Sequence, residues 1–138
     1  MIKRGNEMKK ILLILAVLVV TVAAFTGCGR DSAGNEGYRN ITAEEAKELM
    51  DNEDVIIVDV RRQDEYDAGH IEDAVLIPNE TIEDEAPDVL EDRDAKILVY
   101  CRSGRRSKEA SQKLLELGYT EVYDFGGIID WPYGTVIE

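Results

Sequence analysis

Cysteine and histidine are scarce in this sequence, which has two cysteines, Cys28 and Cys101, and a single histidine, His70. So few ligands cannot form a typical zinc site, and we expect no metal and no cofactor. The segment that ends at Cys28 has the features of a targeting sequence, which leaves Cys101 as the one cysteine of the folded part. An intradomain disulfide is therefore excluded.

Basic residues are also few: the chain has 16 lysines and arginines against 29 acidic residues, a formal net charge of −13. Residues 1–27 hold four of those basic residues and one of the acidic ones, so the remainder carries a formal charge of −16. Such an excess of negative charge repels nucleic acid and anionic lipid surfaces. We therefore expect no nucleic-acid partner.

The apolar run over residues 11–25 is shorter than the roughly 20 residues that a membrane-spanning helix needs. It follows Lys9 and Lys10 and ends in Phe25-Thr26-Gly27-Cys28. This ending resembles the lipobox of bacterial lipoproteins, in which the cysteine is lipidated and becomes the mature N-terminus. An uncleaved N-terminal anchor and ordinary secretion are the alternatives, and all three interpretations export the domain.

We favour the lipoprotein interpretation, which divides the chain into three parts. Residues 1–27 are a signal peptide, residues 28–37 a flexible tether on a lipidated Cys28, and residues 38–138 a single domain. The predicted location is the bacterial cell envelope, outside the cytoplasm, with the lipid anchor holding the protein to a membrane.

Strand-like and helix-like patterns alternate along the domain. Thr42-Ala43-Glu44-Glu45 is a capping box that opens a helix, and the β-branched run at residues 55–60 is typical of a buried strand. Further expected elements are a short helix at 64–68, a strand at 74–77, a short helix within the acidic stretch 80–94, a strand at 97–100, a helix at 107–117 and a strand at 122–124. This order predicts an α/β fold with a central, mainly parallel sheet flanked by helices on both faces.

Cys101 lies where the strand at 97–100 ends and a helix is about to begin, the place where ligands bind to parallel sheets. Backbone N–H groups and the positive end of a helix dipole favour the thiolate, the form that attacks electrophiles. The following residues, Arg102-Ser103-Gly104-Arg105-Arg106, add three arginines that can hold an oxyanion. The alternative is a buried structural cysteine, but crowded arginines in an acidic chain favour a nucleophile in an anion-binding loop.

Three ordered segments resemble the rhodanese family. The first is Asp59-Val60-Arg61 with Glu65-Tyr66-Asp67-Ala68-Gly69-His70-Ile71 and 74–78. The second is Tyr100-Cys101-Arg102-Ser103-Gly104-Arg105-Arg106-Ser107, and the third is Phe125-Gly126-Gly127-Ile128 through Trp131. A departure is Glu72-Asp73, where the family usually has a Pro-Gly pair, and it concerns a turn.

The resemblance implies a sulfurtransferase with Cys101 as the catalytic nucleophile. A sulfane donor such as thiosulfate would leave a persulfide on Cys101, which then passes its sulfur to a thiophilic acceptor, either a small molecule or an acceptor protein. Substrate would be bound by the loop residues Arg102, Ser103, Gly104, Arg105 and Arg106. Asp59 and Arg61 would support the loop structurally, His70 would be a packed residue, and Trp131 a core or lid aromatic.

Two other functions are conceivable for a cysteine loop of this kind, a phosphatase and a sulfur carrier. Phosphatases of related fold place an arginine after five residues that follow the cysteine, whereas Ser107 holds that position here and Arg106 comes one place early. This spacing argues against phosphatase chemistry. A carrier or binding module, which accepts one sulfur atom and delivers it to a partner protein without turnover, remains the alternative to an enzyme.

Overall fold

Five parallel strands form the central sheet of the computed structural model, which describes residues 37–83 and 87–137. Their order is β1-β5-β4-β2-β3. The strands are β1 (Arg39–Asn40), β2 (Ile56–Asp59), β3 (Val75–Leu76), β4 (Lys96–Cys101) and β5 (Glu121–Gly127). The helices are α2 (Ala43–Asn52), α3 (Gln63–Asp67) and α4 (Arg105–Glu116), with 3₁₀ turns η1 (Asn79–Thr81) and η2 (Ile128–Asp130). The predicted α/β fold is confirmed.

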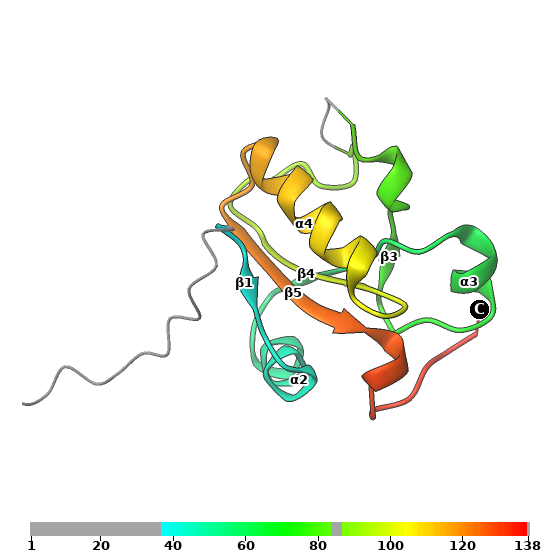
Figure 1. Cartoon of the computed structure of the whole chain (residues 1–138). Coiled ribbons are helices and arrows are strands. Elements are labelled where there is room, and N and C mark those ends of the chain that lie inside the picture. Colours follow the sequence, from blue (N-terminus) through cyan, green and yellow to red (C-terminus); the bar gives the residue numbers. More distant parts are fainter. Residues whose placement is uncertain (1–36, 84–86, 138) are drawn as a thin grey trace, which may run out of the picture. The chain divides into compact units, whose positions relative to one another are not determined.

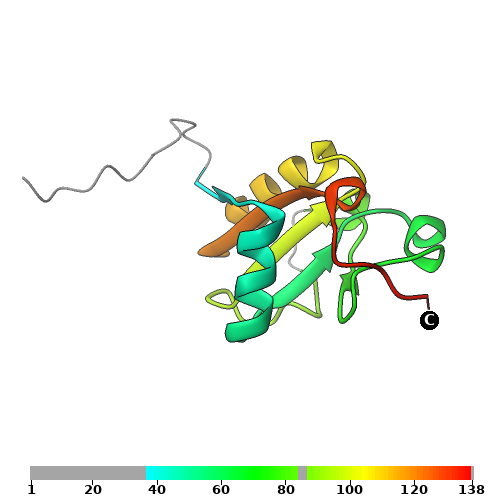
Figure 2. The ribbon, with the colours of Figure 1, turned by 90° about the horizontal axis from the view of Figure 1, so that it is seen from below.

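The two faces of the sheet are covered by different helices, α4 on one side and α2 on the other (Figures 1 and 2). Successive side chains of a strand point to opposite faces, so β4 contributes to both cores. Val99 and Cys101 belong to the core beneath α4, whereas Leu98 and Tyr100 belong to the core beneath α2. This alternation sends the thiol of Cys101 and the phenol of Tyr100 to opposite sides of the sheet.

Most of the expected elements are present. The capping box of α2 is complete, with reciprocal hydrogen bonds between Thr42 and Glu45. Helix α4 begins two residues earlier than expected, and β5 continues through Gly126 and Gly127. The helices form where the sequence predicts them because the capping residues and the apolar face of each helix favour a helix over the same residues.

The short helix expected within residues 80–94 is wrong for the residues described there. Only the single 3₁₀ turn η1 reaches into this stretch, and residues 87–94 form turns and irregular backbone. The Asp92 carboxylate accepts a hydrogen bond from the Asp94 N–H at 2.8 Å, a local contact that competes with helix formation. Of the three apolar residues at helical spacing in this stretch, Ile82 and Leu90 are buried and Val89 is 59% exposed.

The parallel register brings the carboxyl ends of β2, β4 and β5 to one edge of the sheet. Asp59 pairs with Tyr100, and Cys101 pairs with Gly127 after an irregularity in the ladder. Segments far apart in sequence therefore meet around Cys101. Residues 1–36, with the predicted signal peptide, most of the tether and Cys28, lie outside the described residues. Within residues 37–83 and 87–137, no helix has the length and apolar character needed to cross a membrane.

Candidate active site

Cys101 is the last residue of β4 and is 1% exposed. Its Sγ accepts a hydrogen bond from the Gly104 N–H, with a nitrogen–sulfur distance of 3.0 Å. Gly104 is the N-cap of α4 and has a φ of 104°, a conformation that L side chains rarely adopt. The first N–H groups of α4 have no acceptor within the helix, so the helix begins with donors suited to an anion.

The loop after Cys101 is held against β5. The Ser107 hydroxyl lies 3.0 Å from the Gly104 carbonyl oxygen and 3.3 Å from that of Gly126, in reach of donating to either. A Cβ atom on Gly127 would come within 2.3 Å of the Arg102 carbonyl oxygen. The Ile129 N–H donates to that same oxygen at 3.3 Å. Gly127 is therefore needed for close backbone packing on the loop, whereas Gly126 has a φ of 87°, a conformation that L side chains rarely adopt.

A pocket of about 590 Å³ opens above Cys101. It is lined by Arg62, Glu80, Cys101, Arg102, Ser103, Arg105 and Arg106. Arg102 and Arg105 are exposed, and the nearest acidic partner of Arg105 is the exposed Glu109 at 3.6 Å. Four of the five predicted substrate-binding residues thus line one pocket, and the fifth, Gly104, binds the thiol itself. The thiol lies at the pocket floor, where a slender anionic molecule can reach it end-on.

Arg106 lines the pocket, but its guanidinium is engaged with Glu65 of α3. Two hydrogen bonds, at 2.7 and 2.8 Å, join the two nitrogens to the two carboxylate oxygens. The hydrogen bond from Arg106 is the main reason that the pKa of Glu65 falls to about 2, and Glu65 in turn raises the pKa of Arg106. Arg106 therefore links the loop to α3, and the Glu65 carboxylate neutralises its charge.

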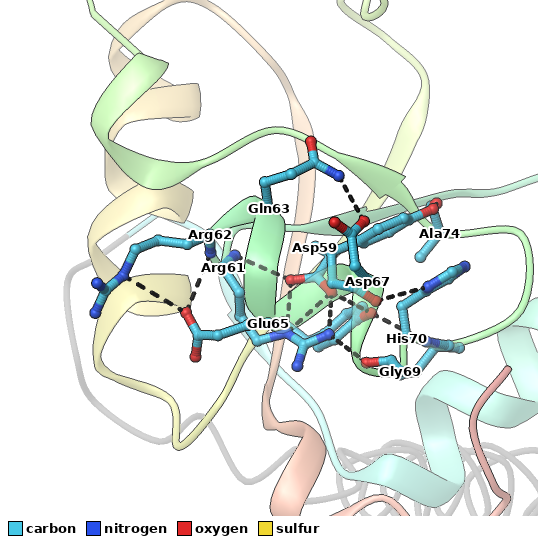
Figure 3. A network of polar contacts seen from close by, with 12 residues as sticks. Asp59, Arg61, Arg62, Gln63, Glu65, Asp67, Gly69, His70 and Ala74 are labelled. Carbon is cyan, nitrogen blue, oxygen red and sulfur yellow. Dashed lines mark hydrogen bonds and ion pairs between the residues drawn. The ribbon is translucent and has the colours of Figure 1, made fainter. Parts of the chain in front are cut away.

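A buried polar network lies near the carboxyl ends of β2 and β4 (Figure 3). The Arg61 side chain donates to both oxygens of Asp59, with the shortest contact at 2.6 Å, and also to the Gly69 carbonyl at 2.8 Å. The Tyr100 hydroxyl donates to Asp59 at 2.7 Å and accepts from the Ile71 N–H at 3.1 Å. These contacts fix the segments that flank the loop, and Asp59 and Arg61 do not line the pocket above Cys101.

Two members of this network, Tyr100 and Arg61, have raised pKa values. Burial, followed by the charge of Asp59, raises the pKa of Tyr100, so its hydroxyl keeps the proton that it donates. Burial opposes the charged form of Arg61, but the hydrogen bond and the charge of Asp59 outweigh it and raise the pKa of Arg61. Arg61 therefore keeps its charge and Tyr100 its proton at neutral pH, so both continue to donate to Asp59.

His70 and Trp131 are packing residues. His70 is 2% exposed, stacks on Tyr66 with ring centroids 3.7 Å apart, and its Nδ1 lies 3.0 Å from the Tyr66 carbonyl oxygen. The ring of Trp131 packs against Phe125 on the α2 side of the sheet. Neither lines the pocket above Cys101. Within residues 37–83 and 87–137, no three histidine, cysteine or acidic side chains are grouped as metal ligands would be.

The sequence predicts no role for three residues in or near the pocket: Arg62, Glu65 and Glu80. Arg62 is the N-cap of α3, and its backbone N–H donates to the Glu65 carboxylate at 3.2 Å. That spacing is visible in the sequence, although it does not reveal the pairing of Glu65 with Arg106. Glu80 lies in an acidic stretch with no distinguishing pattern.

A thiol at the end of a parallel strand, at a helix N-terminus and in a pocket lined by arginines, defines a site suited to an anionic ligand. The model of the rhodanese-like domain matches residues 42–132, and the chain belongs to this family of rhodanese-like sulfurtransferases. A rhodanese-related protein from Thermoplasma volcanium is 32% identical, with a TM-score of 0.63 over 73% of this chain and 100% of that one. A rhodanese with anions from E. coli is 30% identical, with a TM-score of 0.57 over 62% of this chain and all of that one.

Among curated proteins, the tRNA uridine(34) hydroxylase of Photorhabdus laumondii is 36% identical over 96 residues. The match covers 66% of this chain but 27% of the relative. The chain thus spans about a quarter of the length of the curated relatives that it matches. The likeness is to a rhodanese-like portion of a larger protein.

Proposed function

We propose that the protein transfers sulfane sulfur from thiosulfate, or a related anionic donor, to a thiophilic acceptor through a persulfide on Cys101. The observation that carries this proposal is the position of the Cys101 sulfur. It accepts the Gly104 N–H at the floor of a pocket that Arg62, Arg102 and Arg105 surround. An anionic donor would be attracted by these arginines while its terminal sulfur reaches the thiolate.

The reaction has two balanced steps. The Cys101 thiolate attacks the outer sulfur of thiosulfate, a sulfur–sulfur bond forms to Cys101, and the bond within thiosulfate breaks to release sulfite. An acceptor then attacks the outer sulfur of the persulfide, and Cys101 leaves as a thiolate. No base is required when the thiolate is the attacking group. The loop amides and the N-terminus of α4 would stabilise the anionic persulfide between the two steps.

Intact mass of the purified protein, before and after thiosulfate, tests the first step. The wild type should gain about 32 Da, one sulfur atom, and Cys101→Ser should gain none. The variant should keep its fold, since the substitution removes little volume at a site of 1% exposure. A gain of sulfur by the variant would show that another group accepts it and would overturn the assignment.

Turnover distinguishes an enzyme from a carrier. An enzyme should release sulfite repeatedly when thiosulfate and cyanide are both present, with ping-pong kinetics. A carrier would release one equivalent and stop. We propose the enzyme because the pocket is open to small molecules directly above Cys101.

We do not propose that the protein hydroxylates tRNA. The curated relatives named for it are matched over about a quarter of their length, and this chain carries a formal charge of −13, which repels a polyanion. The arginines of the loop are gathered around a pocket of about 590 Å³ and do not form an extended basic surface.

We also propose that the protein works outside the cytoplasm, anchored to a membrane by lipid on Cys28. This rests on the apolar segment and the Phe25-Thr26-Gly27-Cys28 sequence, both outside the described residues. Radiolabelled fatty acid should enter the wild type in bacterial cells but not Cys28→Ala. Label in the variant would refute the lipid site. A wild-type protein that a high-salt wash releases from membranes would refute a stable, multiply acylated anchor.

A further inference from the structure

Among residues 37–83 and 87–137, Glu80 is the one carboxylate that lines the pocket above Cys101. It lies in η1, whose backbone is fixed on both sides. The Asn79 N–H donates to the Val60 carbonyl at 3.1 Å, and the Lys113 ammonium donates to the Asn79 carbonyl at 2.9 Å. The Glu80 side chain is exposed and makes no hydrogen bond or ion pair with any residue in the described ranges. A negative charge is therefore held at the pocket without a bonded partner.

This charge is unfavourable for a donor that carries only negative charge. The other charged side chains at the pocket that are only loosely paired with acidic groups are those of Arg62, Arg102 and Arg105. Arg106 is neutralised by Glu65, and Glu80 lies close enough to contribute to raising the pKa of Arg106. The pocket thus offers separate places for anionic and cationic groups. A ligand that carries both would match it better than a simple dianion.

We infer that Glu80 selects sulfur acceptors that carry an ammonium group, and that the preferred acceptor is a small thiol with both a carboxylate and an ammonium. This inference rests on the proposed function, because the acceptor acts on the Cys101 persulfide. The arginines bind the carboxylate and Glu80 binds the ammonium. The thiolate of the acceptor attacks the outer persulfide sulfur, a new sulfur–sulfur bond forms, and Cys101 leaves as a thiolate, so electrons balance without an added oxidant or reductant.

Two matched thiols test the inference: cysteine, and 3-mercaptopropionate, which is the same molecule without its ammonium group. The measured quantity is the ratio of kcat/KM for cysteine to kcat/KM for 3-mercaptopropionate, with thiosulfate as donor and the purified full-length protein. Intrinsic differences between the two thiols cancel when the ratio is compared between variants. Glu80→Gln should lower the ratio about two- to fivefold, the range of an exposed ion pair. Glu48→Gln, an exposed change in α2, is the control and should leave the ratio unchanged.

The rate of persulfide formation from thiosulfate, measured separately, provides a second test of the role of Glu80. In Glu80→Gln, persulfide formation from thiosulfate should be as fast as in the wild type or faster, because a repelling charge is gone. An unchanged ratio in Glu80→Gln, or an equal fall in Glu48→Gln, would overturn the role of Glu80 while leaving the proposed function intact. Failure of the wild type to gain about 32 Da from thiosulfate would overturn both.

Discussion

The ion pair between Arg106 and Glu65 gives the loop a thermodynamic role that can be measured. Because Arg106 follows two other arginines in the loop, the sequence predicts that Arg106→Ala relieves repulsion between like charges. The melting temperature would then be unchanged or slightly higher. The structure reverses this expectation, because Arg106 is 13% exposed and bonded to both oxygens of a carboxylate that is 21% exposed. Removing one partner leaves a partly buried charge without its counterion.

The magnitude follows from the pKa of Glu65, which falls from an ordinary 4.5 to about 2 in the folded protein. Each pKa unit corresponds to about 1.4 kcal/mol, so ionised Glu65 contributes about 3 kcal/mol to folding at neutral pH. Arg106 is the largest cause of the shift, and a backbone hydrogen bond at Arg62 and the charge of Arg61 supply part of it. We therefore expect Arg106→Ala to lower the free energy of unfolding by about 2 to 3 kcal/mol at pH 7.

The depressed pKa of Glu65 also determines how the stability contributed by this ion pair depends on pH. A carboxyl whose folded pKa is depressed contributes stability that is fully present above its unfolded pKa of 4.5 and is lost as the pH falls toward about 2. The difference between wild type and Arg106→Ala should therefore shrink by about 1 kcal/mol between pH 7 and pH 3.5. Urea unfolding at both pH values measures it.

Arg105→Ala is the matched control, since the Arg105 side chain is 80% exposed and lies 3.6 Å from an exposed Glu109. It should change stability by less than about 1 kcal/mol at either pH. An Arg106→Ala protein as stable as wild type at pH 7, or a difference that stays constant down to pH 3.5, would refute the argument that this pair stabilises the fold.

Two further substitutions test the packing around the site. Gly127→Ala places a Cβ against the Arg102 carbonyl and should slow sulfur transfer more than tenfold by displacing the loop. Gly134→Ala meets no neighbouring atom but is strained at a φ of 87°, so it should lower stability and leave the rate unchanged; equal rates in both variants would contradict this. Tyr100→Phe removes two buried hydrogen bonds and should lower the free energy of unfolding by about 1 to 3 kcal/mol. The exposed Tyr133→Phe serves as its control, and an equal effect of both changes would count against the network.

The sequence predicts the elements that have strong local signals. The capping box before α2, the β-branched run of β2 and the glycine after α4 each determine structure within a few residues. They are correct because local and tertiary preferences agree there. The position of Cys101 follows in the same way, since it needs only a strand end and a helix start.

What the sequence could not supply are contacts between distant segments. Glu65 and Arg106 are 41 positions apart, and their pairing depends on the parallel register that sets β2 beside β4. The expected helix within residues 80–94 is wrong because Ile82 and Leu90 reach the core from turns and irregular backbone, while Val89 is exposed. Periodicity over so short a segment is a weak predictor.

The four arginines around the pocket divide into two kinds, a distinction that a count of charges conceals. Arg106 and Glu65 together are neutral, so their pair fixes the loop on α3 and adds little net field at the pocket. Arg62 and Arg105 have acidic partners only at 3.8 and 3.6 Å, and their side chains are 71% and 80% exposed. These loosely paired guanidiniums, together with the exposed Arg102, can turn toward an arriving anion without first breaking a bidentate bond. Donor binding should therefore depend mainly on Arg62, Arg102 and Arg105, while Arg106 keeps the loop in place.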